Sequence, residues 1–287
     1  MKPQVKKYGL LVLIFISCGF FNYHPQMLFG LNSPHFGWIF SLLSTILILY
    51  ITRIIDPNKW KQKLGIDFKL IDIWKISILT ILVLILSYFV VDYVSMLNGY
   101  DFKPKLLYYK IYLGSNYPFH YVLANYIYYI PETFNEEMII GALLLFGIER
   151  KFKKLNKNFI AVFVALIFSS MHQGLYKWSP VQSGELLTLT TTITLFFVGI
   201  LRNSLILKTR NIAFSWAIHL SFNIIFFSGF FINIDTQSFP SEPEVFNIVF
   251  GNLTMLAVTG LLALISTIWL NMDKLKINEQ KTTGYNV

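Results

Sequence analysis

Apolar runs of membrane-spanning length cover much of this sequence. A helix needs roughly 17–25 mostly apolar residues to cross a bilayer. Eight runs of about this length or longer are candidates, at about residues 8–23, 36–52, 76–97, 119–149, 158–174, 185–201, 211–232 and 246–271. They predict an all-α fold, a polytopic membrane helix bundle of about eight transmembrane helices. No internal repeat or linker interrupts this pattern, so we expect a single integral-membrane domain over residues 1–287.

The composition excludes several other classes of protein. Charged residues make up 14% of the 287 residues, whereas a soluble domain carries about 25%. This deficit excludes a soluble globular enzyme and a disordered chain. The net charge of +9 has no basic face on which to gather, so we expect no nucleic-acid partner. The single cysteine, Cys18, excludes an internal disulfide framework and a cysteine-based zinc site.

The basic residues predict how the helices are oriented. With the N-terminus inside, most of the 24 Lys and Arg residues fall in inner segments, Arg202 among them. The outer segments hold Lys103, Lys105, Lys110 and Lys177. This asymmetry follows the positive-inside rule. We therefore expect a multi-pass protein of the cell membrane, in contact with membrane lipid and with both termini in the cytoplasm.

The N-terminal segment has two interpretations. Met1–Lys7 is basic, residues 9–17 are apolar, and Cys18 follows. This order fits a first membrane helix, and it also fits a signal peptide, including the lipoprotein type in which the cysteine is lipidated. The sequence leaves both interpretations open.

The fourth apolar run, residues 119–149, is too long for one straight crossing of the bilayer. Its 31 residues would make a helix of roughly 46 Å at about 1.5 Å per residue. Pro131 lies inside the run and lacks the backbone N–H that a helix interior uses. We therefore expect a break or kink near Tyr129–Pro131, ahead of the segment that carries Glu136 and Glu137.

A few ionisable side chains fall in the middle of the predicted spans. They are Glu132, Glu136 and Glu137 in the fourth span, His172 in the fifth and His219 in the seventh. An ionisable side chain at the bilayer centre costs about 2.5–3.5 kcal/mol on insertion scales, and such residues usually mark a functional site. The alternative is a structural polar network that holds helices together.

The spacing of these residues indicates which of them can meet. His172 follows Phe168 by four residues, and Asn223 follows His219 by four, so each pair shares one helix face. The adjacent glutamates of the fourth span diverge by about 100° around a helix, so only one can point straight at a common spot. We expect the other to orient the first or to bond to a neighbouring helix. Phe168 is expected to pack in the core or against lipid.

Glutamate, histidine and asparagine side chains together suit peptide-bond hydrolysis inside a membrane. A carboxylate in an apolar site can act as a general base on water, and histidine or asparagine can donate to an oxyanion. Two histidines and one glutamate are also a known ligand set for catalytic zinc. The serines beside the histidines, Ser169, Ser170 and Ser221, are expected to pack helices rather than to act as nucleophiles.

The order of these motifs resembles the CPBP family of intramembrane proteases. This is the CAAX protease and bacteriocin-processing group, also called the ABI family, and it includes the type II CAAX prenyl endopeptidases. The pair Glu136–Glu137, the FxxxH motif at Phe168–His172 and the HxxxN motif at His219–Asn223 follow the family order, with Gly199 in the lead-in to the third motif. The matching region, the motif-bearing catalytic core, runs from about residue 131 to 226.

The resemblance implies a role for each motif residue. Glu136 activates water, and Glu137 supports it or bonds to a neighbouring helix. His172 orients the water or shares a metal, while His219 and Asn223 stabilise the oxyanion. Zinc is one option, with Glu136, His172 and His219 as its ligands, and a glutamate-and-histidine mechanism with no cofactor is the other. The implied substrate is a membrane-associated or secreted peptide or protein.

The sequence departs from the family pattern at one position. The first motif of the family is EExxxR, and here Gly141 occupies the arginine position. Glu137 then lacks a partner on its own helix, so an active enzyme needs one from another helix. The alternative is a catalytically silent bacteriocin-immunity or interaction protein on the same scaffold. A transporter with a buried acid–base relay would favour an internal repeat, and the sequence has none.

Overall fold

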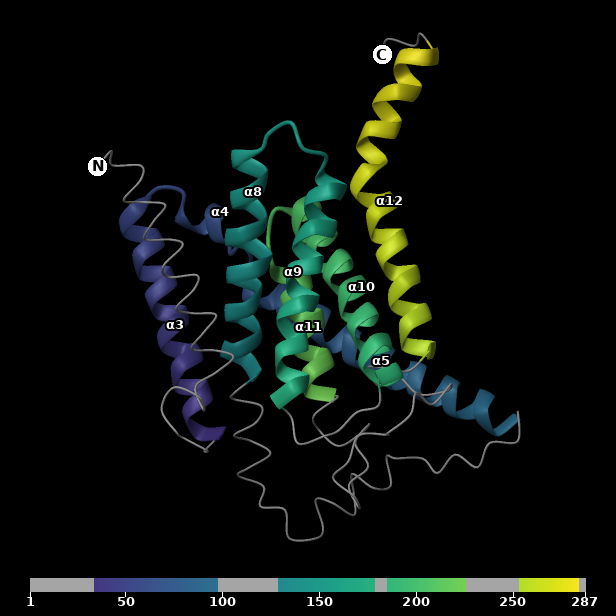
Figure 1. Ribbon diagram of the computed structural model, residues 1–287. Helices are drawn as coiled ribbons and strands as arrows, with labels where there is room; N and C mark the ends of the chain where they lie inside the picture. Colours follow the sequence, from purple (N-terminus) through teal and green to yellow (C-terminus); the bar gives the residue numbers. More distant parts are fainter. Residues whose placement is uncertain (1–33, 98–128, 179–184, 226–252, 284–287) are drawn as a thin grey trace. The chain divides into compact units, whose positions relative to one another are not determined.

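The computed structural model describes residues 34–97, 129–178, 185–225 and 253–283 (Figure 1). These residues form helices and turns and contain no strand, which confirms the all-α fold. The candidate span at 8–23 and the question of a signal peptide lie outside the described residues. The described elements are α3 (Pro34–Ile55), α4 (Trp60–Leu64), α5 (Leu70–Leu97), the π-helix η1 (Glu137–Leu144), α8 (Leu145–Lys151), α9 (Lys157–Trp178), α10 (Glu185–Thr209), α11 (Ala213–Ile225) and α12 (Leu253–Thr283).

One segment of the described chain is a helix both long and apolar enough to cross a membrane. It is Leu189–Thr209, most of α10. Shorter apolar helical segments lie at Leu42–Ile55, Lys157–His172 and Leu256–Met272. The number of membrane spans therefore stays a prediction.

Large apolar side chains are exposed along several helices, while small polar side chains are buried. On α5 the exposed apolar residues are Leu70, Ile71, Trp74, Ile78, Leu79, Leu82, Val83 and Leu86. On α12 they are Val258, Leu261, Leu262, Leu264, Ile265, Ile268, Trp269 and Met272. The buried polar residues include Ser44, Thr45, Thr52, Ser77, Thr190, Thr191, Thr194, Ser204, Thr259 and Ser266. Continuous apolar surfaces of this kind are typical of helices that face hydrocarbon, and small polar residues are typical of contacts between such helices.

The chain divides into two compact units. The first unit comprises Met1–Leu144 and Asn211–Phe239, and the second comprises Leu145–Arg210 and Pro240–Val287. The first unit contains the glutamate pair and the HxxxN motif, and the second contains the FxxxH motif. The expectation of a single domain stays a prediction.

In the first unit, α11 packs against α5 around Trp216. The indole ring lies 4.7 Å from the ring of Phe134 and 6.1 Å from that of Phe68, between centroids. The Ser221 hydroxyl donates within its own helix to the carbonyl of Ala217 (2.6 Å) and across to that of Ser77 on α5 (3.2 Å). The core of this unit therefore combines aromatic packing with hydrogen bonds between helices.

The helix that carries the glutamate pair is continuous but irregular. Residues 129–136 are α-helical, so Pro131 does not break the helix within the described part of the chain. The irregularity comes later, where η1 runs from Glu137 to Leu144 and α8 continues the helix to Lys151. A π-helical segment accommodates a wider turn than an α-helix and is frequent at functional sites. The break or kink predicted near Tyr129–Pro131 stays a prediction, because the described part of this helix begins at residue 129.

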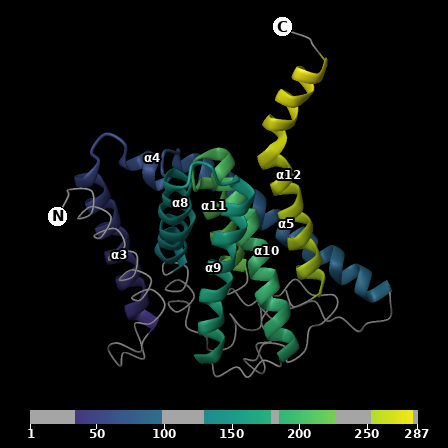
Figure 2. The same cartoon turned by 45° about the horizontal axis from the view of Figure 1, so that its top comes forward.

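In the second unit, α9 and α10 lie side by side and come closest at Gly199 (Figure 2). A Cβ atom at this glycine would lie 2.9 Å from the Cβ and 3.0 Å from the Cα of Ala165. Two hydrogen bonds join the same helices. The Asn203 amide donates to the carbonyl of Ala161 (2.8 Å), and the Ser169 hydroxyl donates to that of Thr192 (2.8 Å). The family's glycine is therefore required here by close contact between two backbones.

Gly199→Ala should destabilise the second unit, because the added methyl group meets the rigid Cα and Cβ atoms of Ala165. Overpacking of this kind costs about 1–3 kcal/mol. The matched control is Gly147→Ala, since a Cβ at Gly147 meets nothing within 4 Å. Thermal unfolding of the two purified variants in detergent measures the difference. An unfolding midpoint for Gly199→Ala at or above that of Gly147→Ala would contradict the close approach.

Candidate active site

The two motif glutamates lie at the junction between the α-helical segment and η1, and both are buried. Glu136 is 7% exposed, and Glu137 is 0% exposed. The π-helix begins at Glu137. Glu136 therefore lies at the end of an α-helical segment, and Glu137 lies at the start of a π-helical one. An ionised carboxylate at such a position needs hydrogen-bond donors around it.

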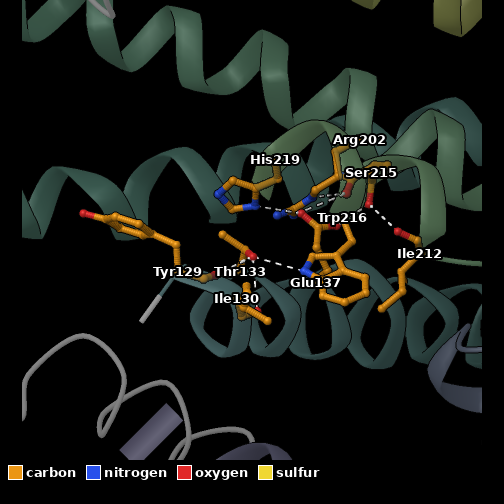
Figure 3. A network of polar contacts seen from close by, with 10 residues as sticks. Tyr129, Ile130, Thr133, Glu137, Arg202, Ile212, Ser215, Trp216 and His219 are labelled. Atoms are coloured by element: carbon orange, nitrogen blue, oxygen red, sulfur yellow. Dashed lines mark hydrogen bonds and ion pairs between the residues drawn. The ribbon is translucent and has the colours of Figure 1, made fainter. Parts of the chain in front are cut away.

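Helix α11 supplies two donors for Glu137, as Figure 3 shows. The hydroxyl of Ser215 donates to Oε2, and Nδ1 of His219 lies 3.1 Å from Oε1. Ser215 and His219 are four residues apart and therefore share the helix face that meets the carboxylate. This contact confirms one of the two alternatives for Glu137, a bond to a neighbouring helix.

A second set of contacts holds α11 against the glutamate helix. The indole Nε1–H of Trp216 donates to the hydroxyl oxygen of Thr133 (3.1 Å), and the Thr133 hydroxyl donates to the carbonyl of Tyr129 (2.7 Å) (Figure 3). Phe134 packs against the same indole ring. The glutamate helix and α11 are thus joined by polar and aromatic contacts in addition to those of Glu137.

The contact with Glu137 directs the chemistry of His219. Nδ1 is the ring nitrogen that faces the Glu137 carboxylate. In the doubly protonated ring, Glu137 is the counter-ion of the imidazolium, and Nε2–H is a hydrogen-bond donor. Asn223 is half-buried one turn further along α11, on the same face as His219. This face of α11 therefore offers two donors of the kind that stabilise an oxyanion.

His172 belongs to the second unit, where α9 fixes its ring. Its Nδ1–H donates to the carbonyl of Phe168 (2.8 Å), because a carbonyl oxygen can only accept. The neutral ring then carries its lone pair on Nε2. The centroids of the Phe168 and His172 rings lie 4.4 Å apart. Phe168 is buried, as expected for a packing residue.

The span predicted at residues 185–201 belongs to a longer helix, which also contains Arg202. Helix α10 continues to Thr209, and Arg202 lies inside it, 5% exposed. Its guanidinium lies over the ring of Phe168, 4.1 Å from the centroid, and contacts the Asn203 side chain at 3.4 Å. The sequence feature that indicates this longer helix is the apolar segment after Arg202, which includes Leu205, Ile206 and Leu207. Those residues extend the helix and bury the arginine.

Ser215 is a second residue that the sequence reasoning missed. Ser215 precedes His219 by four residues on a predicted helix. This spacing puts the two residues on one helix face and could have identified Ser215 from the sequence. Ser169 and Ser221 behave as expected, since they donate to backbone carbonyls in helix contacts, whereas Ser170 is exposed. Ser215 differs because its hydroxyl meets a carboxylate.

The described residues contain no group of three or more His, Cys, Asp or Glu side chains that could hold a metal ion. Both motif histidines engage a protein group through Nδ1. Histidine nitrogen and glutamate oxygen are suitable ligands for zinc, but no three-ligand cluster is present in the described part of the chain. Zinc on Glu136, His172 and His219 therefore stays a prediction.

Glu137→Leu should destabilise the protein, because it leaves the Ser215 hydroxyl and the His219 ring without their acceptor. An unsatisfied buried donor such as the Ser215 hydroxyl costs roughly 1–3 kcal/mol, and the partly exposed His219 ring adds less. Thermal unfolding in detergent measures the loss.

The matched control is Glu149→Leu. Glu149 also accepts from two groups, Nη1 and Nη2 of Arg210, the latter at 2.7 Å, and this hydrogen bonding raises the pKa of Arg210 above its ordinary value. Arg210 is 51% exposed, and such surface pairs contribute only about 0–1 kcal/mol. Equal losses of stability in the two variants would show that Glu137 is not held in the way described.

Comparison with known families connects this arrangement to a protease. Residues 118–225 match the family model described as "Type II CAAX prenyl endopeptidase Rce1-like". Neither a curated protein nor a solved structure matches the chain. The matched region contains all three motifs, and it confirms the resemblance to the CPBP family. Proteins of this family are membrane proteins, and the family implies a peptidase with a peptide substrate. Residues 118–225 of this chain are therefore a domain of the Rce1-like type II CAAX prenyl endopeptidase family.

Proposed function

We propose that the protein is an intramembrane endopeptidase that hydrolyses a peptide bond in a membrane-associated or secreted peptide. The observation that carries the proposal is the contact of Glu137 with His219 inside the family domain. In the doubly protonated ring, a buried carboxylate at Nδ1 is the counter-ion of the imidazolium, and Nε2–H is a hydrogen-bond donor. This pairing is a means of stabilising negative charge that develops on a substrate carbonyl.

In the proposed reaction, Glu136 acts as the general base. A water molecule gives one proton to Glu136 while its oxygen attacks the carbonyl carbon of the scissile peptide bond. The second hydrogen of this water is oriented by the lone pair on Nε2 of His172. Glu136 is suited to this task because it is buried next to the junction with η1, and Glu137 is engaged by α11.

His219 and Asn223 act on the intermediate. The carbonyl oxygen becomes an oxyanion and accepts hydrogen bonds from Nε2–H of His219 and from the Asn223 amide. The carbon–nitrogen bond then breaks, and protonated Glu136 returns its proton to the leaving nitrogen. A single oxyanion donor contributes about 10²–10³-fold to the rate in other hydrolases.

We also propose that the protein lies in the cell membrane with about eight spans and both termini in the cytoplasm. The support is the exposed apolar surface of α5 and α12, the apolar length of Leu189–Thr209, and the distribution of Lys and Arg along the sequence. Membrane lipid is then the solvent of these helices.

The absence of the motif arginine favours a second candidate, a catalytically silent bacteriocin-immunity or interaction protein. Gly141 stands at the arginine position. Helix α11 nevertheless provides Glu137 with two donors, which supports the active form of the site. If a cellular phenotype of the protein survives both Glu136→Gln and His219→Ala, the silent candidate replaces proteolysis as the basis of that phenotype.

Glu136→Gln and His219→Ala should each abolish most of the peptidase activity. The expected loss is about 10²–10⁴-fold for the general base and about 10²–10³-fold for the oxyanion donor. The measurement is cleavage of a farnesylated reporter peptide with a CAAX C-terminus by the full-length protein in detergent. Glu132→Gln is the matched control on the same helix and should retain activity. Equal activity of all three variants would contradict the proposed roles.

Removal of divalent metal should leave the cleavage rate unchanged, because the proposed roles of Glu136, His172, His219 and Asn223 require no metal. Full-length protein is treated with a strong chelator, its metal content is measured by mass spectrometry, and cleavage of the same reporter is followed. Loss of activity on chelation and recovery on addition of zinc would instead assign Glu136, His172 and His219 as zinc ligands.

A further inference from the structure

The Ser215 hydroxyl does not bond as the other hydroxyls of these helices do. Serine and threonine in a helix commonly donate to the carbonyl four residues earlier. Ser221 does so at 2.6 Å, Thr209 at 2.8 Å and Thr267 at 2.8 Å. The contact of Ser215 with the backbone, to the carbonyl of Ile212, is long at 3.4 Å. Its hydroxyl is directed instead at Oε2 of Glu137.

The two oxygens of Glu137 are thus engaged by two residues of one helix face. Oε2 accepts from Ser215, and Oε1 faces Nδ1 of His219. A carboxylate engaged at one oxygen only can turn about its last side-chain bond. Engagement of both oxygens fixes the carboxylate plane, and the plane fixes the direction from which the imidazole approaches.

We infer that Ser215 is a positioning residue for the Glu137–His219 pair. The inference rests on the proposed function, because it assigns Ser215 to the oxyanion-stabilising side of the site. In the family pattern an arginine on the glutamate helix is expected to orient the second glutamate, and Gly141 has no side chain to do so. Ser215, 4% exposed, reaches this carboxylate from α11.

The orientation of His219 explains why a hydroxyl that does not touch the substrate affects the rate. An oxyanion donor must be aimed at the developing charge, and small errors of angle or distance weaken it strongly. Substrate binding depends on this angle far less. Loss of the hydroxyl should therefore lower kcat and leave KM nearly unchanged.

The experiment compares Ser215→Ala with Ser221→Ala. Both serines are buried on α11, but the Ser221 hydroxyl bonds to backbone carbonyls. Full-length protein is prepared with ¹⁵N-labelled histidine rings, and the His219 signals are assigned by their loss in His219→Asn. Ser215→Ala should shift or broaden the His219 nitrogen signals, whereas Ser221→Ala should leave them in place.

Activity on the farnesylated CAAX reporter is the second readout. Ser215→Ala should lower kcat about 10- to 100-fold, Ser215→Thr should restore most of it, and Ser221→Ala should retain it. Ser215→Cys, which keeps the size but is a weak donor, replaces the alanine variant if that variant does not fold. Identical His219 spectra for the Ser215 and Ser221 variants would overturn the inference. A wild-type protein that does not cleave the reporter would count against the proposed function, and the spectra would still decide the role of Ser215.

Discussion

The buried carboxylate of Glu137 is the constraint on which the motif region of the first unit depends. A fully enclosed glutamate is costly unless donors surround it, and here the donors come from a helix that begins about 75 residues later in the chain. The need to satisfy this one group therefore ties the HxxxN helix to the glutamate helix. The contacts of Trp216 with Thr133 and Phe134 reinforce the same junction with polar and aromatic interactions.

This constraint also bears on the missing arginine. In a chain with the EExxxR motif, the partner of the second glutamate is expected on the same helix. In this chain α11 provides Ser215 and His219. A hydroxyl and an imidazole can orient a carboxylate as a guanidinium does. In the proposed mechanism His219 combines two tasks, because Nδ1 faces Glu137 and Nε2–H of the imidazolium donates to the substrate. The departure at Gly141 thus does not by itself indicate a catalytically silent protein.

The sequence predicted the helical class and the motif residues, but not the local geometry around them. Long apolar runs leave few alternatives to helices, so the all-α fold followed directly. The π-helix at Glu137–Leu144 has no recognisable sequence signal, and the proline of this segment, Pro131, lies six residues before it. The span predicted at residues 185–201 ends before the helix does, because a charged residue near the end of an apolar run, here Arg202, was taken as the boundary of the run. Ser215 was missed because a serine in a membrane helix most often packs or bonds to the backbone.

The most direct measurement of the central claim is an experimental structure of the protein in lipid, with a substrate-derived peptide bound. We predict that one water molecule lies within hydrogen-bond reach, about 2.6–3.2 Å, of the Glu136 carboxylate. Nε2 of His219 should face the peptide carbonyl oxygen, with its other nitrogen on Glu137. Imidazole rings that point into the acyl chains, or a His219 ring turned away from Glu137, would contradict it.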